Sequence, residues 1–95
     1  MIMKKTDLNE DSILNQLEDL ARCFQVEVRY EKLKKESSFY PGGLCKVRGE
    51  RVLIINSLSS PDDKIQTFVK ALKTFDLNQV FIKPALRELI LDQGD

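Results

Sequence analysis

The sequence predicts an α+β domain with the element order αβββαα. Three observations support this prediction. Apolar residues recur at helical spacing near the start of the chain and again after residue 60, they alternate with charged residues from Val26 onward, and they run uninterrupted over residues 52–55. We expect a three-stranded antiparallel sheet with the helices packed on one face, because that arrangement buries all the apolar stripes together.

The first helix is expected over residues 8–24. Asp7 and Glu10 have the spacing of a capping box, and an apolar stripe with intervals of three and four residues follows them. Residues 1–6 precede this signal and are expected to be a disordered tail. The chain has 95 residues, which suits one small domain over residues 7–95.

Three strands are expected next. Val26, Val28 and Tyr30 alternate with charged residues, which predicts a strand with one wet face. Segments 44–48 and 51–56 are expected to pair as a hairpin that turns at Gly49-Glu50 with type II′ geometry. Because residues 52–55 are apolar on both faces, we place the last strand in the middle of the sheet and expect Ile54 to contact the helices.

Two helices complete the prediction. Ser60 and Pro61 are typical of a helix start, and the apolar stripe that follows predicts a helix over 61–75. Residues 77–82 are expected to form a loop or a short extended piece, and Pro84 to open the last helix. The turn-forming run Pro41-Gly42-Gly43 is expected to precede the hairpin.

The composition excludes several classes of protein. It is 42% hydrophobic and 32% charged, which excludes intrinsic disorder. No apolar run approaches the roughly 20 residues of a membrane span, and no signal-peptide pattern is present. We therefore expect a soluble cytoplasmic protein with no membrane partner. Cys23 and Cys45 should then be free thiols, with Cys23 packed as a small apolar residue.

The chain contains no histidine, and this excludes much catalytic chemistry. Ser-His-Asp triads, Cys-His pairs and histidine metal ligation are ruled out, and two cysteines are too few for a closed zinc site. We expect no catalytic residues, no metal, no cofactor and no enzyme activity. One alternative stays open: Lys46 and Arg48 could favour the thiolate of Cys45, which would make it a thiol enzyme or a redox sensor rather than a buried core residue.

The middle of the chain is cationic although the net charge is zero. Residues 26–52 carry seven basic and four acidic side chains. A candidate surface for nucleic acid or another anionic ligand consists of Lys34, Lys35, Lys46, Arg48 and Arg51. We expect Lys46 and Arg48 to share one strand face with Arg51 across the turn. The competing reading is a solvated sheet face, which the absence of a net basic excess favours.

The interleaved aromatic residues of the same region are Tyr30, Phe39 and Tyr40, which could stack on bases. The alternative is that they pack in the core.

Two resemblances bear on the assignment. Residues 20–21, 28–31, 42–49, 75–77 and 84–89 resemble a family of small uncharacterised bacterial proteins, over roughly residues 14–91 of this chain. That resemblance implies no known activity. The order helix, strand, hairpin, helix is similar to that of the ImmA/IrrE-type zinc metallopeptidases, whose helix after the hairpin bears H-E-x-x-H. Here that helix contains Thr67 through Leu72 without His or Glu, so the resemblance implies a version without metal and without proteolysis.

The leading hypothesis is a non-enzymatic protein-interaction module. Its partner would be another protein or a second copy of the same chain. Binding of nucleic acid through the cationic hairpin ranks second, and thiol chemistry at Cys45 third.

Overall fold

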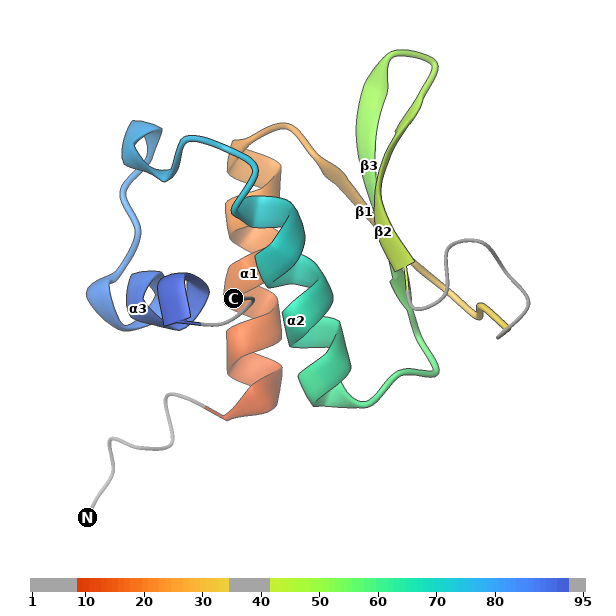
Figure 1. The fold of residues 1–95 in the computed structure, drawn as a ribbon, viewed down its shortest axis with the longest axis horizontal. Coiled ribbons are helices and arrows are strands. Elements are labelled where there is room, and N and C mark those ends of the chain that lie inside the picture. Colours follow the sequence, from red (N-terminus) through yellow and green to blue (C-terminus); the bar gives the residue numbers. More distant parts are fainter. Residues whose placement is uncertain (1–8, 35–41, 93–95) are drawn as a thin grey trace.

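The computed structural model describes residues 9–34 and 42–92. It has an α+β fold with α1 at Glu10–Cys23, β1 at Glu27–Glu31, β2 at Gly42–Val47, β3 at Glu50–Asn56, α2 at Pro61–Leu72, the 3-10 turn η2 at Leu77–Gln79 and α3 at Pro84–Asp92. Figure 1 shows α1 and α2 side by side against one face of the sheet, with α3 on the far side of this helix pair. The predicted order αβββαα is confirmed.

The prediction of a purely antiparallel sheet is wrong. The strand order is β1-β3-β2, and β3 pairs antiparallel with β2 but parallel with β1. In the chain, residues 32–41 separate β1 from β2, which is too long a connection for a tight turn. In the sheet, β3 lies between these two strands. The central position of β3 is confirmed, and its two-sided apolar character is the physical reason.

Strand alternation corrects the expectation for Ile54. Leu53 and Ile55 are fully buried in the main core, whereas Ile54 is half-buried and lies on the face without helices. Successive side chains of a strand point to opposite faces, so Ile54 cannot share the face of its neighbours. The helices therefore pack on Leu53 and Ile55.

The helix termini follow from local hydrogen bonding. Asn9 is the N-cap of α1, where its side chain accepts from the Ser12 N–H at 2.8 Å; the predicted cap Asp7 lies outside the described residues. The helix ends in a Schellman motif, with the Val26 N–H donating to the Ala21 carbonyl at 3.1 Å and Gln25 at φ 62°. The predicted cap Ser60 is confirmed and accepts from the Asp63 N–H at 3.1 Å.

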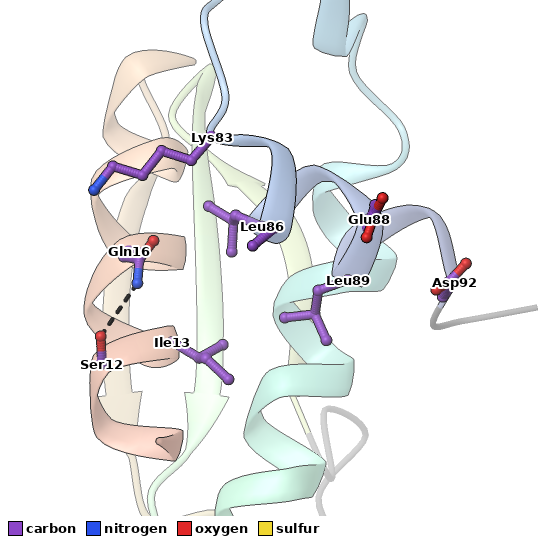
Figure 2. A pocket seen from close by; sticks show the side chains of 9 residues that line it. Ser12, Ile13, Gln16, Lys83, Leu86, Glu88, Leu89 and Asp92 are labelled. Carbon is purple, nitrogen blue, oxygen red and sulfur yellow. Dashed lines mark hydrogen bonds between the residues drawn. The ribbon is translucent and has the colours of Figure 1, made fainter. Parts of the chain in front are cut away.

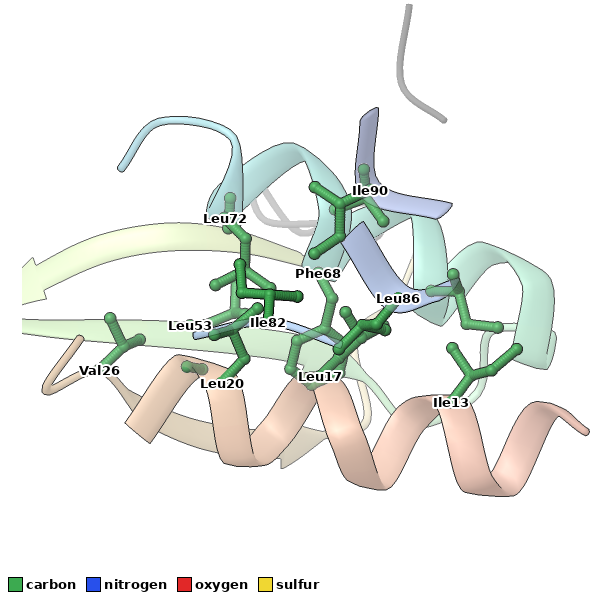
Figure 3. Packing of buried hydrophobic residues seen from close by; sticks show 14 of the residues in the cluster. Ile13, Leu17, Leu20, Val26, Leu53, Phe68, Leu72, Ile82, Leu86 and Ile90 are labelled. Carbon is green, nitrogen blue, oxygen red and sulfur yellow. The ribbon is translucent and has the colours of Figure 1, made fainter. Parts of the chain in front are cut away.

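The core lies between the sheet and the helix pair, and continues between that pair and α3. Leu17, Phe68 and Ile90 are each 0% exposed and come from the three helices, as Figure 3 shows. Asn56 and Thr67 are the buried polar side chains among the described residues, and Asn56 is 1% exposed. The hydrogen bonds of Asn56 connect two strand ends. Its side chain accepts from the Leu33 N–H at 3.1 Å and donates to the Leu33 carbonyl at 3.2 Å, which ties the end of β3 to the segment after β1.

Candidate functional site

The candidate site is an open cleft of about 570 Å³ between the outer edge of the sheet and α2. One wall is β2, the other is one stripe of α2, and the β3–α2 connection closes one end. The lining residues are Gly42, Gly43, Leu44, Leu58, Ser59, Ser60, Asp63, Gln66, Thr67, Lys70 and Ala71.

The β2 wall begins with two glycines that leave its backbone uncovered. Gly42 has φ +124°, and a Cβ there would lie 2.2 Å from the Ile54 carbonyl oxygen, so only glycine fits this close approach. A Cβ at Gly43 would have no neighbour within 4 Å. The expected turn over Pro41-Gly42-Gly43 is therefore wrong for its glycines, which belong to β2, while Pro41 lies outside the described residues.

The hairpin turn sets which backbone groups of β2 point into the cleft. Its central residues are Arg48 and Gly49, with φ 55° and 84°, so the turn has the positive φ values of type I′ and lies one residue before the predicted position. The flanking pair, Val47 and Glu50, is the hydrogen-bonded pair of such a turn. Hydrogen-bonded and non-hydrogen-bonded pairs alternate along an antiparallel ladder.

From this alternation we infer that Cys45 is bonded to β3, whereas Leu44 and Lys46 direct their N–H and C=O groups to the outer edge. Among the described residues, no strand pairs with that edge. The cleft therefore presents the outward main-chain groups of Leu44 beside a helix, and the same edge continues beyond the cleft to Lys46.

The α2 wall is polar because three polar residues recur on it at helical intervals. Asp63, Thr67 and Lys70 recur at four and three residues and so share one helix face. The Thr67 hydroxyl donates to the Asp63 carbonyl at 3.0 Å, which fixes its rotamer, while Asp63 and Lys70 are exposed. This wall can contact polar side chains of a bound segment.

The structure brings two of the cations predicted from the sequence together. Lys46 lies opposite Arg51 on the face toward the helices, whereas Arg48 lies in the turn rather than on a strand. The expectation that Lys46 and Arg48 share a strand face is therefore wrong, because the turn begins one residue earlier than predicted.

Arg51 is committed to internal contacts. Its Nη2 donates to the Phe24 carbonyl at 3.0 Å, and its guanidinium carbon lies 4.8 Å from the centre of the Phe75 ring. The Phe24 and Phe75 rings stack with centroids 4.9 Å apart. Arg51 thus joins the C-terminal end of α1 to the residues after α2, where a cation is favourable.

The remaining predicted binding residues are scattered. Lys34 is exposed beyond β1, and Lys35, Phe39 and Tyr40 lie outside the described residues. Tyr30 donates a hydrogen bond to a carboxylate oxygen of Glu18 on α1. Partial burial and this hydrogen bond raise the pKa of the Tyr30 phenol above its ordinary value.

The two thiols are in different settings. Cys45 is half-buried opposite Val52, on the sheet face without helices. Cys23 is exposed, so its predicted role as a packed apolar residue is wrong. The helical stripe ends beside Cys23 rather than including it.

Within residues 9–34 and 42–92, no group of three or more Cys, Asp or Glu side chains is arranged to hold a metal ion. No helix in the same ranges has both the length and the apolar character needed to cross a bilayer.

Sequence reasoning missed both walls of the cleft. The sequence predicts a turn at Gly42-Gly43, although glycine inside a strand also marks a close backbone approach. For Thr67 and Lys70 it predicts only a place in a helix. Their proximity to β2 depends on how α2 packs beside the sheet, and this is a tertiary property.

Comparisons with protein-family models, with curated protein sequences and with solved structures found no match for this chain. The two resemblances given above therefore stay predictions.

Proposed function

We propose that this chain is a non-enzymatic protein-interaction module that binds an extended segment of a partner protein along β2. The carrying observation is the cleft of about 570 Å³ beside Gly42, Gly43 and Leu44, at the start of the edge strand β2, with which no described strand pairs on its outer side. A peptide in extended conformation can form hydrogen bonds with the outward N–H and C=O groups of β2. Such strand addition is a common mode of peptide recognition.

The lining of the cleft indicates which side chains the segment carries. On the α2 side, Asp63, Gln66 and Lys70 offer charged and amide groups, which suits polar side chains. At the closed end Leu58 is 63% exposed, which suits one apolar side chain. Hydrogen bonds to the edge would supply affinity, and these contacts would supply specificity.

The test uses a peptide selected from a random dodecapeptide phage library on the immobilised protein. Amide hydrogen exchange is followed by NMR with and without the peptide. In the free protein the Leu44 and Lys46 amides should exchange rapidly, while the Cys45 amide, bonded to β3, should be protected. Bound peptide should slow the exchange of the Leu44 and Lys46 amides by about tenfold or more. A tenfold effect corresponds to about 1.4 kcal/mol of stabilisation of the hydrogen-bonded state.

Two matched variants sharpen the test. Lys46→Pro removes one outward N–H and leaves the hydrogen bonds between β2 and β3 in place, and proline is tolerated at such positions of edge strands. Lys46→Ala keeps the N–H. Lys46→Pro should weaken peptide binding by about fivefold or more, and Lys46→Ala by less than about twofold. Equal affinities for the two variants, no selectable peptide, or peptide binding without protection of Leu44 would contradict the proposal. Concentration-dependent protection of Leu44 in the protein alone would instead identify a second copy as the occupant.

A further inference from the structure

A second groove lies on the opposite side of the helix pair, between α1 and the segment that contains α3. Its wide part encloses about 710 Å³ and its narrow part about 250 Å³. The two parts adjoin, because Gln16, Lys83 and Leu86 line both of them. It extends along α1 from Ser12 to Cys23, about 16 Å at the rise of a helix, which is the length of about three helical turns.

The floor of the groove is apolar. Figure 2 shows Ile13 of α1 and Leu86 and Leu89 of α3 directed into the space between the two helices. At the narrow end the floor continues through Leu20, and Phe81 is 85% exposed there, the most exposed of the large apolar residues described.

The polar rim is acidic on balance. Asp19, Glu88 and Asp92 line the groove against the single cation Lys83. Asp19 is paired with Arg22 at 2.8 Å, whereas Glu88 and Asp92 form no ion pair with the described residues. An occupant with basic side chains at the α3 rim would therefore gain charge complementarity.

The walls determine the backbone of the occupant. Along most of the wide part both walls are helices, whose backbone groups are hydrogen-bonded within each helix, whereas Phe81, Ile82 and Lys83 at the narrow end precede α3. An extended peptide would therefore find few main-chain partners along the wide part, in contrast to the edge of β2. A helix brings its own satisfied backbone and packs its side chains into the space between two others.

We propose that the groove between α1 and α3 binds an amphipathic helix of a partner protein, with leucine-like side chains on the floor and lysine or arginine side chains toward Glu88 and Asp92. This mode is known generally as helix-in-groove recognition. The proposal is independent of strand addition at β2, because the two sites lie on different elements.

The experiment uses two fluorescein-labelled synthetic peptides, one a helical Leu/Lys repeat of four turns and the other its Leu/Glu counterpart. Fluorescence anisotropy should show saturable binding of the Leu/Lys peptide and at least about tenfold weaker binding of the Leu/Glu peptide. Phe81→Ser should weaken binding by about tenfold, as loss of an aromatic anchor does. Leu91→Ser, which changes a residue that is 51% exposed but does not line the groove, should change affinity by less than about twofold.

The two native thiols give a second readout without mutation. Cys23 lines the narrow end of the groove, whereas Cys45 lies on the sheet. Bound Leu/Lys peptide should slow alkylation of Cys23 by about fivefold or more and leave Cys45 within about twofold, as burial at an interface would. Equal binding of the two peptides, equal effects of the two serine variants, or unchanged alkylation of Cys23 would overturn the proposal.

Discussion

Gly42 and Gly43 offer a direct test of how the β2 edge is built, because the same substitution should be strongly destabilising at one position and nearly neutral at the next. At Gly42 an alanine Cβ would lie 2.2 Å from the Ile54 carbonyl oxygen, about 1 Å closer than real Cβ contacts allow, at φ +124°. Such backbone strain alone costs about 1–3 kcal/mol, and separating β2 from β3 adds to it. Gly42→Ala should therefore lower the free energy of unfolding by about 3 kcal/mol or more.

Gly43→Ala is the matched control. Its Cβ would meet no atom within 4 Å, and its φ is not in the positive region. The variant should lie within about 1 kcal/mol of the wild type, or be slightly more stable because alanine restricts the unfolded chain.

The assay is urea unfolding followed by far-ultraviolet circular dichroism, which suits a chain without tryptophan. With a slope of about 1–2 kcal/mol per molar urea, Gly42→Ala should lower the midpoint by at least about 1.5 M. Equal midpoints for the two variants would refute the close approach of Gly42 to β3 and with it the geometry of the cleft.

Two further predictions follow from the structure. Leu53→Ala should lower the free energy of unfolding by about 3–5 kcal/mol and Ile54→Ala by about 1–2 kcal/mol, because of these two side chains only Leu53 faces the helices. Urea melts measure both values. If Ile54→Ala were the more destabilising variant, the assigned strand faces would be wrong. The pKa of the Tyr30 phenol is higher in the folded protein than its value of about 10 in the unfolded chain, so the neutral phenol contributes to stability. This contribution is fully present below about pH 10 and is lost as the pH rises through the pKa of the folded protein. The difference in urea midpoint between wild type and Tyr30→Phe should therefore be constant from about pH 7 to 9 and change above about pH 10. A pH-independent difference up to about pH 11 would contradict the raised pKa.

Part of the candidate site could be predicted from the sequence. The pairing of β2 with β3 in a hairpin is predicted, as are the N-cap Ser60 and the helix that it begins, whereas the place of the glycine pair in β2 is not. The predicted binding surface rests on charge, and charge does not say what a side chain contacts. Arg51 illustrates the difference, because its contacts with Phe24 and Phe75 connect elements far apart in the chain.

The sequence by itself determined the type and order of the elements. Helical and strand periodicity, caps and proline positions are local, so they identify α1, β3 and α2, and the two-sided apolar run identifies β3 as the central strand. Only the tertiary structure decided that β1 runs parallel to β3 and that α2 packs beside the outer edge of β2. Long-range strand pairing is set by which surfaces become buried together, and the connection from β1 to β2 is too long for a two-residue turn that would have fixed the direction of pairing in advance.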